Sequence, residues 1–210
     1  MTRAHILRDV LGVIVLAGGQ SSRMRGQDKM TARFGSDTVL NMCLTNVAGQ
    51  FPDSPIIVVG PYRELPAEMP ESRVTRVRED PPGGGPVPAI RAGMDAVPSD
   101  AALVAVLAGD MPEAPAVLGD LVQPLATYDN LDVAVARAGG AVQPLLAVYR
   151  RRTLAGVLAA DSSLRTARSL LTGLRHRFVE VPERLCYDID TPEDLSAARS
   201  RIGPTRRRRR

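Results

Sequence analysis

Short apolar runs alternate with amphipathic stretches along the first half of the chain. The apolar runs are rich in β-branched residues and occupy residues 12–16, 55–60 and 102–107. Runs of this kind are typical of central parallel strands that are buried on both faces. Between and after them, apolar positions recur at helical spacing over residues 39–47, 89–94 and 116–125. This alternation predicts an α/β fold around a mostly parallel sheet, which binds ligands outside the carboxyl ends of its strands.

The second half of the chain breaks this alternation. Two strand patterns, at 131–136 and 145–149, are separated by only eight residues, which is too short for a crossover helix. The spacing therefore predicts a small antiparallel excursion. Helical patterns at 150–160 and 164–173 and a strand pattern at 178–181 follow. Thr191 and Pro192, with acidic residues after them, predict the N-cap and first residue of a last helix that ends before Gly203.

The chain has 210 residues, of which 44% are hydrophobic and 24% charged, as is ordinary for a globular protein. We expect a single domain over residues 1–203 and a disordered arginine-rich tail over 204–210. No apolar run approaches the roughly 20 residues that span a bilayer, so we expect no membrane partner. Cys43 and Cys186 lie far apart without metal-ligand spacing, which favours free thiols and a cytoplasmic location. We expect a monomer or a weakly associating homo-oligomer.

The net charge of +4 belongs to the tail rather than to the body of the protein. Without residues 206–210 the chain has 22 basic and 23 acidic residues. A nucleic-acid-binding face needs basic residues spread over the folded surface, so nucleic acid is disfavoured as a partner. Only one of the 27 basic residues is a lysine, Lys29. Because an ammonium differs from a guanidinium where a compact charge must reach into a tight site, Lys29 is a candidate functional residue.

A glycine-containing loop follows the first predicted strand and ends at Lys29. Gly18 and Gly19 permit backbone conformations closed to other residues, and consecutive N–H groups in such a loop can form an anion-binding nest. Arg23 and Lys29 add two positive charges. The loop has neither the Walker A spacing nor Gly-x-Gly-x-x-Gly, and a structural turn explains the two glycines equally well. The two cations and the single lysine favour a triphosphate site.

Carboxylates that could hold a metal ion lie in two segments. Asp110 follows the strand predicted at 102–107 and therefore lies at the carboxyl edge of the sheet. Asp188 and Asp190 alternate in an extended segment and point the same way. Mg²⁺ takes oxygen ligands, often one or two carboxylates together with phosphate oxygens. Turn capping by Asp110 and helix capping by the other two aspartates are the structural alternatives.

Four motifs, taken in order, resemble those of the MobA-like nucleotidyltransferases. They are Leu-Ala-Gly-Gly with a following Arg-Met and Asp-Lys, then Gly-Asp-Met-Pro, Gln-Pro-Leu and Asp-Ile-Asp-Thr-Pro-Glu-Asp-Leu. The resemblance extends over roughly residues 12–200. It implies a three-layer Rossmann-like nucleotidyltransferase fold and Mg²⁺ as the cofactor. It also implies a reaction in which an acceptor phosphate attacks the α-phosphorus of a nucleoside triphosphate and pyrophosphate leaves.

The resemblance also implies roles for individual residues. The nucleotide-binding residues would be Leu16, Ala17, Gly18, Gly19, Lys29, Asp80 and Asp110. The catalytic residues would be Arg23, Lys29 and Asp110, and the acceptor-binding residues Gln143 and Asp188. The metal ligands would be Asp110 and Asp190, with Asp188 as the alternative to Asp190. The Asp80 carboxylate could accept hydrogen bonds from both guanine N1–H and N2–H₂. Residues 83–86 resemble the glycine-proline segment that shapes the base or acceptor pocket.

Several positions depart from the family pattern. Arg25 replaces the usual glycine after Arg-Met, and Gly60 stands near where an asparagine often contacts the nucleotide. Asp188 and Asp190 occupy positions where asparagine is common. These departures bear on the identity of the acceptor more than on the type of reaction.

The function that the resemblance implies is transfer of GMP from GTP to molybdopterin, which forms the guanine dinucleotide cofactor. The Gly-Gly pair after Leu-Ala resembles the GTP-using branch. Transfer from CTP, or to another phosphorylated acceptor such as a small phospho-acid, is the alternative within this class. A nucleotide-binding regulator and an interaction protein recruited through the arginine tail are the alternatives from other classes. Retention of Lys29 and Asp110 favours an enzyme over a regulator.

Overall fold

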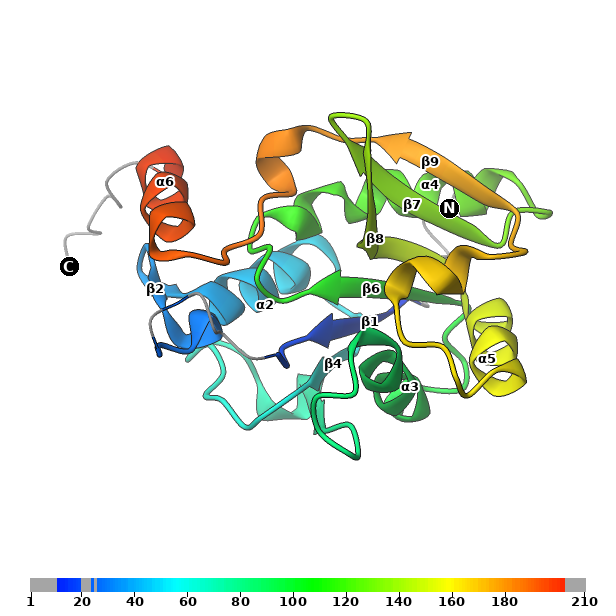
Figure 1. The fold of residues 1–210 in the computed structure, drawn as a ribbon, viewed down its shortest axis with the longest axis horizontal. Coiled ribbons are helices and arrows are strands. Elements are labelled where there is room, and N and C mark those ends of the chain that lie inside the picture. Colours follow the sequence, from blue (N-terminus) through cyan, green and yellow to red (C-terminus); the bar gives the residue numbers. More distant parts are fainter. Residues whose placement is uncertain (1–10, 20–23, 25, 203–210) are drawn as a thin grey trace.

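The computed structural model describes residues 11–19, 24 and 26–202. Within them a seven-stranded sheet has the order β5-β4-β1-β6-β8-β7-β9 (Figure 1). The strands are β1 (Leu11–Leu16), β4 (Ile56–Val59), β5 (Val74–Val77), β6 (Leu103–Ala108), β7 (Val133–Ala138), β8 (Ala141–Arg150) and β9 (His176–Glu180). Six run in one direction, and β8 runs against its neighbours β6 and β7. The predicted mostly parallel sheet with an antiparallel excursion is confirmed.

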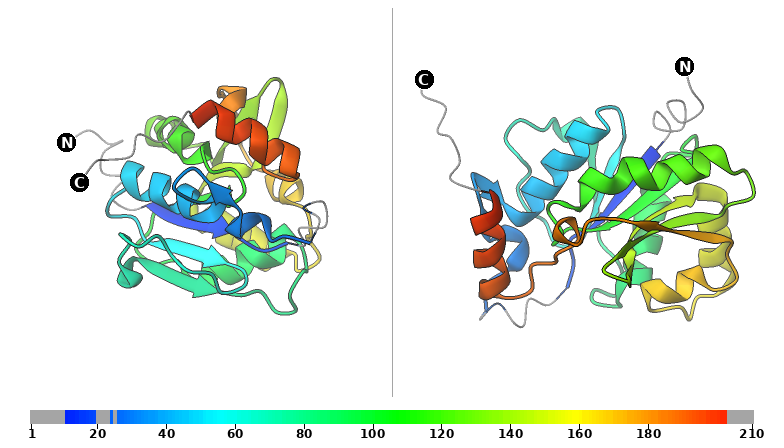
Figure 2. Two further views of the ribbon diagram at one scale, coloured as in Figure 1. Left: turned by 90° about the vertical axis from the view of Figure 1, so that its left-hand side faces the viewer. Right: turned by 90° about the horizontal axis from the view of Figure 1, so that it is seen from above.

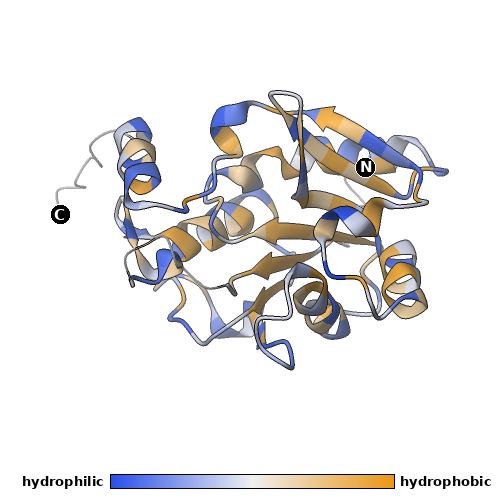
Figure 3. Ribbon diagram, viewed as in Figure 1, coloured by the Kyte–Doolittle hydropathy of each residue, from blue (hydrophilic) through white to orange (hydrophobic). Residues whose placement is uncertain are grey.

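Helices cover both faces of the sheet, so the protein has three layers (Figure 1, Figure 2). One face carries α2 (Val39–Gln50) and α4 (Leu118–Thr127), and the other carries α3 (Pro86–Ala96) and α5 (Arg151–Ala160). In β1, Val13 and Val15 join the core under α2 and α4, whereas Ile14 joins the core under α3 and α5. Burial on both faces explains why the central strands are continuously apolar (Figure 3).

Short 3₁₀ helices, labelled η, lie in the connections. They are η1 (Lys29–Thr31), η2 (Glu71–Arg73), η3 (Ala114–Val117), η4 (Ala167–Leu171) and η5 (Glu183–Leu185). A two-stranded antiparallel sheet, β2 (Arg33–Phe34) and β3 (Asp37–Thr38), connects η1 to α2. Among the described residues, no helix has the length and apolar character that would let it cross a membrane.

The last helix, α6 (Pro192–Ile202), begins at a reciprocal cap. The backbone N–H of Asp194 donates to Thr191 Oγ1 at 3.1 Å, and the N–H of Thr191 donates to Asp194 Oδ2 at 2.8 Å. This arrangement satisfies backbone donors that the first helical turn leaves unpaired. The predicted start of this helix at Thr191-Pro192 is confirmed, and Gly203 lies outside the described residues.

Two sequence predictions differ from the structure. The stretch predicted as helical over 164–173 contains only the short η4, in which Thr166 caps the N–H of Ser169. The edge strand β5 was not predicted, because its four residues are half polar and only Val74 is fully buried. Arg23 and the tail over 204–210 lie outside the described residues.

The carboxyl ends of β1, β4 and β6 meet at one edge of the sheet, as parallel pairing requires. Because β8 is antiparallel to β6, with Leu107 opposite Leu146, the first residues of β8 lie near this same edge. The segment that leads into α6 reaches the edge as well, since the N–H of Ile189 donates to the carbonyl of Asp110 at 3.0 Å. Residues from five separate parts of the chain are thus brought to one place.

Candidate active site

Lys29 lies between two carboxylates at this edge. Its Nζ is 2.5 Å from Asp110 Oδ2 and 2.7 Å from Asp190 Oδ1. Lys29 opens η1, Asp110 follows the end of β6 by two residues, and Asp190 precedes α6. The side chains of Lys29 and Asp110 are each 14% exposed, and that of Asp190 is 28% exposed. The structure therefore joins three of the predicted site residues in one partly buried group, which we call the Lys29 cluster.

The charges in the Lys29 cluster influence one another. Burial raises the pKa of Asp110, the Lys29 ammonium opposes this rise, and the charges of Asp188 and Asp190 add to it. Burial lowers the pKa of Lys29, but the two aspartates that it contacts outweigh this effect and raise the pKa overall. The ammonium therefore stays charged, and Asp110 is a carboxylate whose ionised form depends on neighbouring positive charge.

The cluster also fits a divalent cation. Oδ1 of Asp110 is buried and has no hydrogen-bond partner in the part of the chain that the structure describes. Mg²⁺ is usually bound by one or two carboxylates, with substrate phosphates and waters as its other ligands. Among residues 11–19, 24 and 26–202, no group of three or more acidic, histidine or cysteine side chains is arranged as a complete metal site. A cation held here by Asp110 and Asp190 would therefore take its other ligands from substrate phosphates or water.

A cavity of about 530 Å³ lies on one side of Asp110, and we call it the glycine-loop cavity. It is lined by Leu16, Gly18, Gly19, Met30, Pro61, Arg78, Glu79, Pro82, Gly83, Gly85, Pro86, Ala89, Ala108, Asp110 and Leu145. Four of the predicted nucleotide-binding residues, Leu16, Gly18, Gly19 and Asp110, are thus in its wall. Three residues of the glycine-proline segment 83–86 line it too. Its position outside the ends of β1 and β6 is where an open α/β sheet binds its ligand.

Glu79, which sequence analysis did not single out, lines this cavity, whereas Asp80 is exposed and does not. Glu79 is 8% exposed, and its Oε1 accepts a hydrogen bond from the N–H of Gly83 at 3.1 Å. A Cβ built on Gly18 would lie 3.5 Å from the same oxygen. Oε2 is buried without a partner in the described residues. Only burial distinguishes the two adjacent acids, and the sequence pattern does not reveal it.

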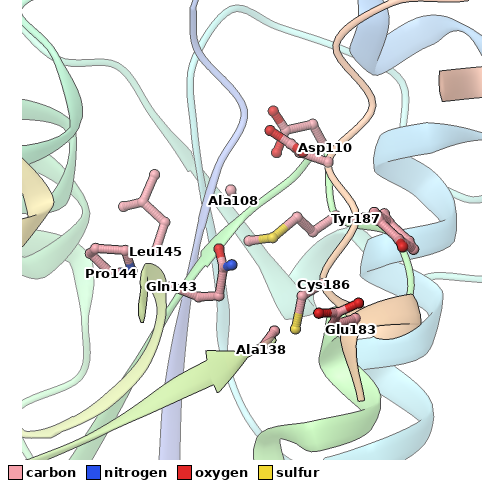
Figure 4. Close-up of a pocket in the computed structure, with 11 residues that line it drawn as sticks. Ala108, Asp110, Ala138, Gln143, Pro144, Leu145, Glu183, Cys186 and Tyr187 are labelled. Carbon is pink, nitrogen blue, oxygen red and sulfur yellow. The ribbon is translucent and has the colours of Figure 1, made fainter. Parts of the chain in front are cut away.

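A second cavity, of about 460 Å³, lies on the other side of Asp110, and we call it the Gln143 cavity. Its lining residues are Ala108, Asp110, Met111, Ala138, Gln143, Pro144, Leu145, Glu183, Cys186, Tyr187 and Asp188. Figure 4 shows Gln143 on one side and Cys186 and Glu183 on the other, with the Asp110 carboxylate at one end. Both residues predicted to contact an acceptor, Gln143 and Asp188, line this cavity.

A bulge in β8 directs residues into the Gln143 cavity. Ala147 pairs with Val135 of β7, but the next pair joins Gln143 to Ala136, so the three residues between them are left out of the ladder. Pro144 lies in this interruption, where its missing N–H breaks no ladder bond. Bulges commonly re-aim side chains beside a functional site. Pro144 and Leu145 of the Gln-Pro-Leu motif therefore lie in an interruption of the β7–β8 pairing, and all three residues of the motif line the cavity wall.

The two cavities share Ala108, Asp110 and Leu145. Asp110 is the only charged residue of these three, and it belongs to the Lys29 cluster. Two ligands bound in the two cavities would therefore have their nearest ends beside the same carboxylate and ammonium. Of the other predicted residues, Lys29 and Asp190 lie in the cluster and Ala17 lies in the glycine loop. Arg23 is outside the described residues.

This combination of an open α/β sheet, a glycine loop and paired carboxylates at the carboxyl edge defines a nucleotide-binding protein with a site suited to phosphate chemistry. The chain belongs to the MobA-like NTP transferase domain family, which it matches over residues 13–179. It is 34% identical over 194 residues to a probable molybdenum cofactor guanylyltransferase of Mycobacterium avium. That alignment covers 89% of this chain and 94% of the relative.

Solved structures share the fold. Molybdopterin-guanine dinucleotide biosynthesis protein A from Archaeoglobus fulgidus has a TM-score of 0.62 at 21% identity, covering 91% of this chain and 98% of that protein. Rv0371C from Mycobacterium tuberculosis, in complex with manganese, has a TM-score of 0.63 at 20% identity, covering 90% of this chain and 97% of that protein. The three-layer nucleotidyltransferase fold is confirmed.

Proposed function

We propose that this protein transfers GMP from GTP to the phosphate of a molybdopterin-type acceptor and releases pyrophosphate. The observation that carries the proposal is that the glycine-loop cavity and the Gln143 cavity meet at Asp110. A nucleotide in the first cavity and an acceptor in the second would have their phosphates beside the Lys29 cluster. The name of the Mycobacterium avium relative supports this choice of donor and acceptor.

The chemistry requires alignment and charge stabilisation rather than a protein nucleophile. An oxygen of the acceptor phosphate forms a bond to the α-phosphorus, and the bond from that phosphorus to the bridging oxygen of the leaving pyrophosphate breaks. The acceptor phosphate is already ionised, so no side chain has to remove a proton. Lys29, held by Asp110 and Asp190, presents a fixed positive charge to the phosphates. Preorganised charge of this kind favours the transition state because it needs no rearrangement during the reaction.

Asp110 and Asp190 would hold Mg²⁺ in this site. The unpartnered, buried Oδ1 of Asp110 supports this assignment, and so does the manganese complex of a protein with the same fold. A bound Mg²⁺ polarises phosphate oxygens and orients the triphosphate. Lys29 occupies Oδ2 of Asp110 and thereby leaves Oδ1 for the cation.

Glu79 is better placed than Asp80 to recognise the base. A carboxylate can accept from guanine N1–H and N2–H₂ together, and adenine and cytosine do not offer that pair of donors. Glu79 lies in the wall of the glycine-loop cavity with one oxygen fixed by Gly83, whereas Asp80 is exposed. We therefore assign base selection to Glu79 and keep Asp80 as the second candidate.

The Gln143 cavity suits an acceptor that offers hydrogen-bond donors. Its wall carries the carboxylates of Glu183 and Asp188 and the amide of Gln143, next to apolar surface from Met111 and Leu145. The amino and ring N–H groups of a pterin could donate to such acceptors, and its flat ring could pack on the apolar surface. Gln143 and Asp188 are the residues that we propose contact the acceptor.

A nucleotide titration tests this function first. Purified protein is mixed with Mg²⁺ and GTP, CTP, ATP or UTP, and its thermal unfolding is followed. A ligand at about 100 times its dissociation constant adds about 2.7 kcal/mol to the free energy of unfolding. We expect stabilisation by GTP alone, followed by pyrophosphate release when molybdopterin is added. Stabilisation by CTP alone would indicate a cytidylyltransferase and would contradict the choice of GTP.

A further inference from the structure

A buried arginine joins the two ends of the glycine loop. Arg63 lies in the segment after β4, and its side chain is only 9% exposed. Its Nη1 donates to the carbonyl of Ala17 at 2.6 Å, and its Nε donates to Asp28 Oδ2 at 2.8 Å. Ala17 is the first residue after β1, and Asp28 is the last before η1. One guanidinium therefore bonds to both the first and the last residue of the loop over 17–28.

Asp28 links Arg63 to Lys29, because it caps the 3₁₀ turn that begins at Lys29. Its Oδ1 accepts from the N–H of Met30 at 3.0 Å, and its carbonyl accepts from the N–H of Thr31 at 3.1 Å. Asp28 is thus the N-cap of η1, the 3₁₀ turn that Lys29 opens. Fixing Asp28 relative to Ala17 fixes the base of the Lys29 side chain relative to the glycine loop. On its other side, the Lys29 ammonium is fixed by Asp110 and Asp190.

Gly60 brings the segment that carries Arg63 close enough for this contact. Its φ is +151°, and a Cβ at this position would lie 2.7 Å from the carbonyl carbon of Ala17 and 2.8 Å from the nitrogen of Gly18. These distances are shorter than real Cβ contacts, so a side chain here would push the two segments apart. The position can therefore hold no asparagine without a shift of the loop. The close approach of Gly60 to Ala17 and Gly18 thus places Arg63 within reach of Ala17.

We propose that Arg63 is a positioning residue for nucleotidyl transfer: its guanidinium holds Ala17 and Asp28 at a fixed separation and thereby sets the place of Lys29. This inference rests on the proposed function, because it assigns a role in the same site. Only a guanidinium supplies two donors in a fixed fork that reaches a carbonyl and a carboxylate at once. A lysine at position 63 would keep the charge but could not hold both partners in that geometry.

The first test is kinetic. Arg63→Gln and Arg63→Lys should both lower kcat/KM for Mg-GTP about 100-fold, since a displacement of about 1 Å at a reacting group can cost that much. Arg175→Gln is the matched control, because the exposed Arg175 pairs with Asp132 next to the amino ends of β7 and β9 and has no described bond to the loop. It should leave kcat/KM within about twofold, as expected for an exposed ion pair. Full activity in Arg63→Lys would overturn the proposal in favour of a simple charge effect.

A double variant with Lys29 distinguishes a positioning role of Arg63 from a general effect on the stability of the fold. Adding Arg63→Gln to Lys29→Met should cost little further activity, because residues that act through one another are not additive. If the two losses multiply instead, Arg63 does not act through Lys29. Asp28→Asn provides a second route should Arg63→Gln not fold, since it breaks the same ion pair while its amide oxygen can still cap Met30. Wild-type kcat/KM in Asp28→Asn would also count against the proposal.

Amide hydrogen exchange tests, without any substrate, whether the contacts of Arg63 to Ala17 and Asp28 hold η1 in place. The amides of Met30 and Thr31 bond to Asp28, so Arg63→Lys should make both exchange faster in the free protein and leave β6 amides unchanged. Unchanged exchange at Met30 and Thr31 in Arg63→Lys would overturn the positioning role of Arg63, even if the wild-type protein is an active enzyme. If exchange is faster in Arg63→Lys but the wild-type protein binds no nucleotide, the structural role of Arg63 is supported and the proposed function is refuted.

Discussion

Glu79 and Asp80 are neighbours in the chain with opposite surroundings. The carboxyl group of Glu79 is buried against Gly18 and bonded to Gly83, while the side chain of Asp80 is exposed. Of these two acids, only Glu79 lines the glycine-loop cavity.

This pair gives a matched test of base recognition. Glu79→Gln replaces one acceptor oxygen by an NH₂ donor, which would oppose a donor of guanine. We expect Mg-GTP to bind about ten- to a hundredfold more weakly, the usual cost of losing a charged hydrogen bond, and Asp80→Asn to bind it normally. The wild type should prefer GTP to ITP, which lacks the 2-amino group, and Glu79→Gln should lose that preference. The reverse pattern in the two variants would return the role to Asp80.

Asp110→Asn should remove transfer without unfolding the protein. The amide cannot bind a cation as a carboxylate does, and we expect the rate with Mg²⁺ to fall by about three orders of magnitude. Because burial raises the pKa of Asp110, the folded protein holds the ionised carboxylate less favourably than the unfolded chain does, so removal of the charge should not lower the melting temperature. Near-normal Mg²⁺-dependent turnover of this variant would refute the site assignment.

Lys29→Arg should be poorly tolerated although the charge is kept. The ammonium bonds two carboxylates at 2.5 and 2.7 Å inside a group that is mostly buried. A planar guanidinium is larger and distributes its donors differently, so it would displace Asp110 or Asp190. We expect kcat to fall at least about tenfold with the fold retained, measured beside the wild type and beside Lys29→Met, which removes the charge at the same position. Wild-type kinetics would mean that the single lysine of the chain is accidental.

The two cysteines should report on the Gln143 cavity. Burial, with the Asp110 charge adding to it, raises the pKa of Cys43 to about 12, and this thiol is fully buried. Burial also raises the pKa of Cys186, which lines the cavity and is 8% exposed. Alkylation at pH 8 should therefore be slow and confined to Cys186, because the thiolate is the reacting form.

Peptide mapping by mass spectrometry would locate the modified thiol. We expect modification of Cys186 to block acceptor binding and to leave GTP binding intact, and bound molybdopterin to protect the thiol. Cys186→Ala serves as the control that resists alkylation. Equal modification of Cys43, or loss of GTP binding after alkylation, would contradict this description of the two cavities.

The sequence predicted the central strands well because burial on both faces leaves a continuous apolar signal, as in β1 and β6. Signals that depend on one residue type at one position were equally clear, such as Thr191 and Pro192 at the start of α6. The edge strand β5 was missed because an edge position leaves Thr75 and Arg76 partly in solvent. Periodicity alone also could not distinguish an α-helix from the short η4.

The candidate site shows a similar division. Lys29 and Asp110 could be singled out because one is a unique residue and the other ends a buried strand. Glu79 and Arg63 could not, because their roles depend on burial and on partners far away in the chain. Arg63 is one arginine among 26, and only the folded chain shows that it contacts Ala17 and Asp28.

The reversed direction of β8 has a consequence for how such a site can change during evolution. The glycine-loop cavity is built mainly from segments that follow β1, β4 and β5, whereas the Gln143 cavity is built from the start of β8 and the chain around η5. The hairpin between β7 and β8 turns at Gly139 and Gly140, and the flanking Ala138 and Gln143 line the Gln143 cavity but not the glycine-loop cavity. Substitutions in that hairpin could therefore change the ligand that the Gln143 cavity accepts while the glycine-loop cavity stays the same.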